Sequence, residues 1–203
     1  MNRWVSPTRR IKDMKIIDHS DRKIVNAIMY FASRVNYPFK LKIFKLLFFL
    51  DYIHFKETGR PVTFLHYIAF PKGPVPEKLY DAINERKCSD YFNHNVKLVE
   101  RPDIGEGALQ FILRAGKRPD LEIFSPREKR ILEEVAEVYK NARAEEMSEI
   151  THLKNSPWEK TIKDKGEFQY IDYMLALDEE AEIPEELAAD RKKESEEIRR
   201  IFT

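Results

Sequence analysis

The chain has 203 residues, enough to bury a substantial core within one domain. Its 36 basic and 35 acidic residues leave a formal net charge of only +1, so the overall charge favours neither nucleic acid nor an acidic substrate. We therefore expect no strong nucleic-acid binding. The single cysteine, Cys88, excludes an internal disulfide and suits a reducing compartment.

The N-terminal residues lack the apolar core and the small-residue cleavage site of a signal peptide. The longest apolar stretch, residues 43–55, is interrupted by Lys45 and Asp51 and is shorter than the roughly 20 residues that span a bilayer. We expect a cytoplasmic protein that makes no membrane contact.

The chain begins with a basic arm, residues 1–20, which shows no sustained periodicity. Contact of this arm with phosphates is one interpretation, and a solvated terminus is the one we favour. Apolar residues at helical spacing then predict a first helix over residues 21–35.

Residues 38–58 are apolar on most faces, which predicts a central, buried helix. Gly59 is placed to end this helix in the left-handed conformation, and Pro61 prevents its resumption. The next segment, residues 62–70, is β-branched and aromatic and predicts a strand. One face of this strand would carry Val62, Phe64, Ile68 and Phe70.

A glycine between two prolines follows the predicted strand. Gly73 can adopt a positive φ, Pro74 keeps it out of helical geometry, and Pro76 suits the first turn of a helix that runs to about Asn84. We therefore expect residues 71–76 to form a stiff, exposed loop, which suits either a structural corner or a docking site.

Local signals continue through the second half of the chain. Residues 95–100 and 109–114 flank a glycine-containing turn and predict a β-hairpin. Ser125, Pro126 and Glu128 predict a helix that begins with a capping box.

A further helix is predicted within residues 143–161, ending before Pro157. Its inward side would carry Met147, Ile150 and Leu153. We expect Trp158 to anchor the end of this helix to the core, and His152 to hydrogen-bond to nearby backbone. A short helix is predicted within residues 170–180.

The pattern as a whole predicts an α+β fold, a mostly helical single domain with a small antiparallel β-sheet. This domain would span residues 21–180. Residues 181–203 are polar nearly all round and predict a charged, solvated helical tail.

The best local candidate for chemistry is the set Asp51, His54 and Glu57, spaced three apart on the predicted central helix. A metal site there is the sharper interpretation, and a solvated helix edge is the one we favour. No nucleophile elbow, phosphate-binding loop or paired-cysteine motif occurs in the sequence. We expect no enzyme, no cofactor and no metal.

Four short motifs, taken in chain order, resemble those of the Panacea domain, also called the SocA-like domain. The matching residues are Lys45, Leu46 and Leu47; Gly59, Arg60 and Pro61; Gly73, Pro74, Val75 and Tyr80; and Thr151, His152, Pro157 and Trp158. Phe48 and Phe49 stand where the family commonly has a tyrosine, and the residues beyond Pro184 lie outside the resemblance.

The resemblance implies a non-catalytic antitoxin from a prokaryotic or phage toxin–antitoxin system, which binds and neutralises a toxin encoded beside it. Because the founding member also delivers its toxin to a protease, a cytoplasmic protease is a further candidate partner. The alternatives are a protease adaptor or phage-type regulatory protein without a toxin, and a metal-dependent enzyme. As partner-contact residues we predict Lys72, Gly73, Pro74, Val75 and Tyr80.

Overall fold

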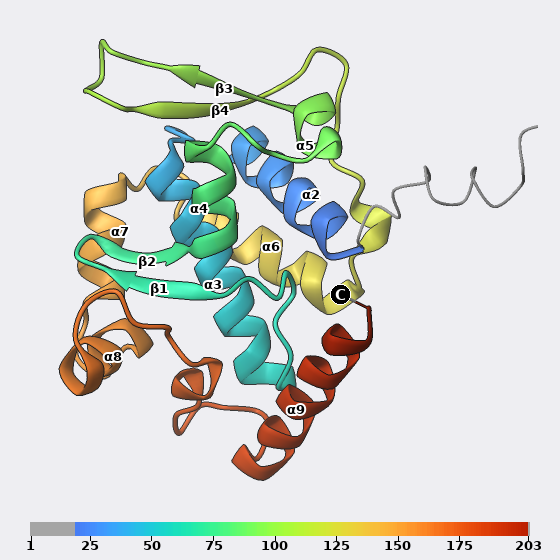
Figure 1. Cartoon of the computed structure of the whole chain (residues 1–203), viewed down its shortest axis with the longest axis vertical. Helices are drawn as coiled ribbons and strands as arrows, with labels where there is room; N and C mark the ends of the chain where they lie inside the picture. Colours follow the sequence, from blue (N-terminus) through green and yellow to red (C-terminus); the bar gives the residue numbers. More distant parts are fainter. Residues whose placement is uncertain (1–18, 203) are drawn as a thin grey trace, which may run out of the picture.

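A central helix, α3 (Lys40–Thr58), organises the fold of the computed structural model, which describes residues 19–202. Twelve of its residues are buried. Helices α2 (His19–Arg34) and α6 (Pro126–Val138) pack against it (Figure 1). The prediction of a central helix is therefore confirmed, whereas the basic arm, apart from its last two residues, lies outside the described part of the chain.

The end of α3 is set by Gly59, as predicted. Its φ of 69° is left-handed, and its N–H donates to Phe55 O over 2.7 Å. The lysines of α3 are less expected, because Lys42 and Lys45 are each only 1% exposed. Lys42 Nζ donates to three backbone carbonyls, one of which belongs to Ala142 at 2.6 Å.

Two strands, β1 (Tyr67–Phe70) and β2 (Gly73–Pro76), form an antiparallel hairpin across α3. The expectation of an exposed loop over residues 71–76 is wrong for Gly73–Pro76, which are a buried strand. Prolines fit there because Pro74 lies opposite Ala69, whose N–H and C=O pair with residues 168–169 on the other side of β1. A proline on a sheet edge loses no ladder hydrogen bond.

Strand β1 is shorter than the predicted strand over residues 62–70, and the face that carries Ile68 and Phe70 is the less buried one. Tyr67 and Ala69 are buried, whereas Ile68 and Phe70 are half-buried. Residues 62–66 leave the strand because Thr63 donates its N–H to Asp51 over 2.7 Å. Phe64 has a φ of 57°, which is incompatible with extended structure.

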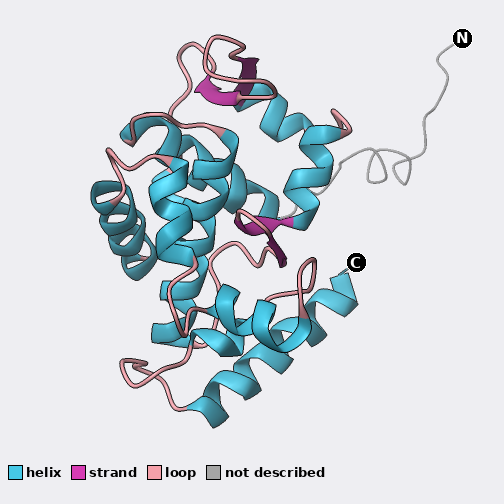
Figure 2. Cartoon of the chain, turned by 90° about the vertical axis from the view of Figure 1, so that its left-hand side faces the viewer, coloured by secondary structure: helices cyan, strands magenta, loops and turns pink. Residues whose placement is uncertain are grey.

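Two further helices and a second hairpin follow. Helix α4 (Glu77–Asn84) begins one residue after Pro76, which acts as its N-cap. The short helix α5 (Asp90–Asn95), which the sequence analysis missed, is capped by Ser89. Strands β3 (Val96–Glu100) and β4 (Leu109–Leu113) form the predicted antiparallel hairpin, and Figure 2 shows the two strand pairs at separate places.

The capping box at the start of α6 is confirmed, since Ser125 and Glu128 each bond the other's backbone N–H. A 3-10 turn, η1 (Leu121–Ile123), precedes it. The predicted further helix is two helices, α7 (Ala144–Thr151) and α8 (Pro157–Lys165). Pro157 starts α8 after its Ser156 cap, and only part of the predicted inward stripe is buried. Met147 is buried, but Ile150 and Leu153 are 38% and 60% exposed.

The chain ends on a 3-10 turn, η2 (Tyr173–Ala176), and a long helix, α9 (Glu185–Phe202). Helix α9 is mostly polar, as predicted, but it also packs on the end of α3 (Figure 1). Ala188 is fully buried against Gly59, and Arg191 donates to Thr58 O over 2.6 Å. The mostly helical α+β class is confirmed. Among the described residues, no helix is long and apolar enough to cross a membrane.

Candidate functional site

Residues of three of the four sequence motifs meet at the tip of the β1–β2 hairpin, and we call this group the motif cluster. It consists of Lys45 from α3, Gly73 from β2, Thr151 and His152 from the end of α7, and Trp158 from α8. The Gly-Arg-Pro motif lies elsewhere, at the end of α3 beside α9.

Lys45 fixes the turn of the β1–β2 hairpin through a hydrogen bond to its backbone. Its buried ammonium group donates to Lys72 O, which also accepts a hydrogen bond from Ser148 Oγ over 3.1 Å. Burial lowers the pKa of Lys45 to about 8, and the nearby negative charge of Glu145 opposes this shift. α3 and α7 therefore fix the same backbone carbonyl.

The backbone at Gly73 leaves no room for a side chain. Its φ is 110°, a conformation that favours glycine. A Cβ added there would lie 2.2 Å from Lys45 Nζ and 2.9 Å from Thr151 Oγ1. Glycine is thus required at this position because the Lys45 ammonium and α7 approach the hairpin backbone directly.

Trp158 fastens α8 to the hairpin. Its indole N–H donates to Phe70 O over 2.9 Å, and its ring stacks on His152 with 3.7 Å between ring centroids. His152 Nε2 is buried without a hydrogen-bond partner, contrary to the expected backbone bond. Burial, and then the positive charge of Lys45, lower the pKa of His152, so we expect a neutral imidazole at pH 7.

Replacing Trp158 with alanine should lower the free energy of unfolding by about 2–3 kcal/mol, because the ring is only partly buried and fully buried aromatic rings cost about 3–5. The phenylalanine variant keeps a ring to stack on His152 but loses the bond to Phe70 O, so a loss of about 1 kcal/mol is expected. Urea unfolding measures both. Equal stability of wild type and the alanine variant would contradict the anchoring role.

Asp51 is fully buried and lies at the centre of a second set of polar side chains, formed with Thr63, Tyr67 and Tyr173. Its carboxylate accepts hydrogen bonds from Thr63 N at 2.7 Å, from the Thr63 hydroxyl, and from the Tyr67 hydroxyl at 2.9 Å. The Tyr173 hydroxyl lies 3.3 Å away. Burial raises the pKa of Asp51 to about 6, and the hydrogen bonds from Thr63 and Tyr67 limit that rise.

Asp51, His54 and Glu57 do not converge on one point. His54 Nδ1 hydrogen-bonds to Arg60 O over 2.6 Å, and Glu57 pairs with Arg127 and Arg130 of α6. The favoured interpretation of a solvated helix edge is also wrong for Asp51 and His54, since both are buried. Over residues 19–202, no three His, Cys, Asp or Glu side chains are arranged to hold a metal ion.

The predicted partner-contact residues differ in exposure. Lys72 is exposed and Tyr80 is half-buried, but Gly73, Pro74 and Val75 are buried. These three cannot offer side chains to a partner in this conformation, because β2 is enclosed by α3, α4 and α7. Glycine and proline are typical of exposed loops, which is why the sequence predicts a loop where the structure has a buried strand.

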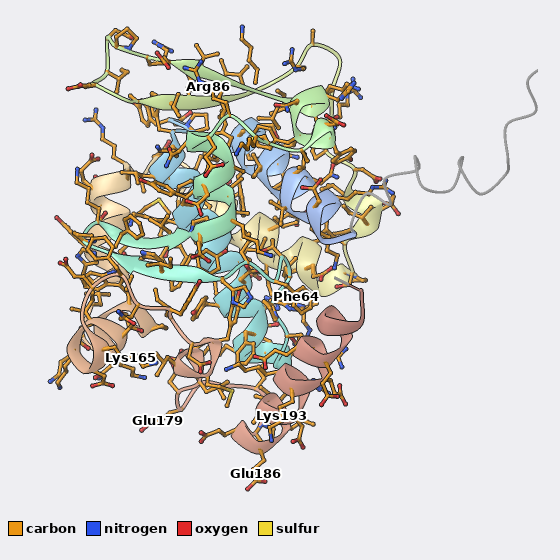
Figure 3. The ribbon with its side chains drawn as sticks, viewed as in Figure 1. Phe64, Arg86, Lys165, Glu179, Glu186 and Lys193 are labelled. Carbon is orange, nitrogen blue, oxygen red and sulfur yellow. The ribbon has the colours of Figure 1, made fainter. Side chains whose placement is uncertain are left out.

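A cleft of about 200 Å³ lies apart from the motif cluster, between the end of α3 and α9. Phe55, Tyr173 and Lys192 are among its lining residues. Figure 3 labels two others, Phe64 and Lys165, which lie below the hairpin. Lys192 is paired with Asp172 over 2.7 Å, and α9 therefore closes one side of the cleft by an ion pair.

Comparison with known proteins gives one finding. A family model described as "Antitoxin SocA-like, Panacea domain" matches residues 43–159. This segment contains the motif cluster, Asp51 with Thr63 and Tyr67, and both hairpins, whereas α2, Tyr173 and α9 lie outside it. No curated protein and no solved structure matches the chain.

Proposed function

Because the chain belongs to the SocA-like antitoxin family with a Panacea domain, we propose that it neutralises a toxin encoded by a neighbouring gene through direct protein–protein binding. The observation that carries this proposal is the family match over residues 43–159. On this proposal the protein acts in the cytoplasm of a prokaryote or in a phage-infected cell, as a binding protein without catalytic activity.

The internal bonding of the buried polar groups supports a binding role. The buried side chains of Lys45 and Asp51 are both hydrogen-bonded to protein atoms. Lys45 bonds Lys72 O, and Asp51 bonds Thr63 and Tyr67. They serve to fix the hairpin and the segment before it. A neutralising complex of standard size would then use about 800 Å² of the surface that this scaffold presents.

Co-expression tests the proposal. The adjacent reading frame is induced alone and then together with this chain, growth is followed, and the two proteins are purified through a tag on one of them. Growth arrest that this chain relieves, with a stable complex, is the expected result. No arrest from either neighbouring frame would contradict the proposal.

Relief of toxicity without a stable complex would favour the adaptor alternative over direct neutralisation. The two are separated by repeating the growth assay in strains that lack individual cytoplasmic proteases. Neutralisation by binding persists in every strain, whereas an adaptor loses its effect when its protease is absent.

A further inference from the structure

Residues 168–171 run along the open edge of β1 and pair with it. Ala69 donates its N–H to Gln169 O, and Phe168 and Ile171 donate to carbonyls of β1 at 2.9 Å. Ile68 pairs with Tyr170, so the same register places Phe70 opposite Phe168. Ile68 and Phe70 alternate along β1 with the buried Tyr67 and Ala69 and therefore lie on its other face. Tyr170 is bridged to Ile68, and the Phe168 ring contacts the Phe70 ring, so all four side chains lie on that side.

We call this surface, together with Tyr80 of α4, the outer aromatic face; it consists of Ile68, Phe70, Tyr80, Phe168 and Tyr170. The ring of Phe70 contacts Phe168 with 5.1 Å between centroids and Tyr80 with 5.4 Å. Phe168 and Tyr170 are 57% and 55% exposed. Two large aromatic side chains, Phe168 and Tyr170, are thus more than half exposed on this face.

Phe168 also has a φ of 61°, a left-handed conformation that is unfavourable for a bulky residue. Its N–H bond to Ala69 O holds it there. Since the ring is largely exposed, burial within this chain does little to offset the cost of that conformation. Strained residues of this kind cluster at binding sites, where the surrounding structure holds a side chain ready for contact.

Charges lie at both ends of the face. The Tyr170 hydroxyl donates to Glu77 over 2.7 Å, and this bond, with the charges of Glu77 and Asp81, raises the pKa of Tyr170. At the other end the Lys40 ammonium lies 5.4 Å from the centroid of the Tyr80 ring. Glu77 and Asp81 thus supply negative charge beside Tyr170, and Lys40 supplies a positive charge beside Tyr80.

We propose that the outer aromatic face is the surface that binds the partner protein, and that the partner presents an apolar strip with a basic side chain beside Glu77. This inference rests on the proposed function and names its contact surface. Exposed aromatic rings are typical interface anchors. A nucleic-acid partner is disfavoured because single-strand sites combine aromatic rings with a basic groove, whereas Glu77 and Asp81 would repel phosphates.

The proposal replaces most of the contact residues predicted from sequence. Tyr80 stays within the surface, and the buried strand β2 becomes its support. Other exposed apolar residues lie on other elements; they include one aromatic, Tyr37, and aliphatic residues such as Ile104 in the β3–β4 turn and Val138 at the end of α6. Ile104 and Val138 serve as matched controls because they are 59% and 71% exposed.

The test measures binding of the full chain to the protein encoded by the adjacent toxic reading frame. Phe168→Asn and Tyr170→Ser remove the exposed rings, and asparagine tolerates the left-handed conformation at 168. Each variant should raise the Kd about tenfold or more, whereas Ile104→Ser and Val138→Ser should change it less than about twofold. Glu77→Lys should also weaken binding, because it reverses the charge that faces the basic side chain. Thermal unfolding of every variant shows whether the fold is kept.

The outcomes separate this inference from the proposed function. A toxin complex that forms equally well with the ring variants would overturn the surface and leave the antitoxin role intact. Equal weakening by the control variants would overturn the surface as well. No complex with wild type would overturn both. If wild type self-associates in size-exclusion chromatography and the ring variants do not, the face joins two copies of this chain and the proposal is wrong.

Discussion

Replacing Asp51 with alanine is expected to lower the free energy of unfolding by about 3–5 kcal/mol. The carboxylate is fully buried and accepts hydrogen bonds from Thr63 and Tyr67. Alanine would leave the Thr63 N–H and two hydroxyl groups without their acceptor inside the core, and each such group costs about 1–3 kcal/mol. Urea unfolding followed by circular dichroism measures the loss, and a value below about 1 kcal/mol would contradict this account.

The variant Asp51→Asn is the matched control, because it keeps the size of the side chain and one oxygen acceptor. Wild type binds the Asp51 proton more tightly when folded, since burial raises the pKa from 3.8 to about 6. Protonated Asp51 therefore stabilises the folded state relative to the unfolded state. This contribution is fully present below about pH 4 and is lost as the pH rises through 6. Wild type should therefore lose about 3 kcal/mol relative to the asparagine variant between pH 4 and 7. A difference independent of pH would contradict the buried carboxylate.

The substitution Gly73→Ala is expected to cost about 2–4 kcal/mol. Its φ of 110° disfavours any residue with a Cβ, and the added atom would meet Lys45 Nζ at 2.2 Å. Lys45 cannot move without giving up its bond to Lys72 O. The effect should appear as a lower urea midpoint at an unchanged slope.

Gly116→Ala separates crowding from backbone strain. Gly116 also has a positive φ, 74°, but no atom lies within 4 Å of an added Cβ. Alanine there should cost about 1 kcal/mol. If the two alanine variants lose the same stability, the contact between Lys45 and the hairpin backbone has no energetic role.

Features with local signals could be predicted from the sequence. The capping box at Ser125 uses side chains three residues apart, and Gly59 ends a helix by its own backbone freedom. The four motifs likewise led to the correct family because they are short and ordered along the chain.

Features that depend on distant partners could not be predicted. Lysine is seldom buried, and no residue near Lys45 in the sequence indicates that the backbone carbonyl of Lys72 accepts its hydrogen bond. The strand Gly73–Pro76 contains two prolines, which usually argue against a strand and fit only because their side of β2 needs no N–H. The outer aromatic face was missed because its Phe168 and Tyr170 lie about a hundred residues from the strand they join.

The pairing of residues 168–171 with β1 has a practical consequence for any attempt to express the family-matched segment, residues 43–159, as a separate fragment. Such a fragment would lack residues 168–171 and leave one edge of β1 open to pairing with other chains. It would also lack Tyr173, whose hydroxyl bonds Leu65 O, and α2, which covers α3. A fragment that keeps these contacts therefore has to include α2 through η2, well beyond the limits of the matched sequence, and α9 is also needed to cover the end of α3.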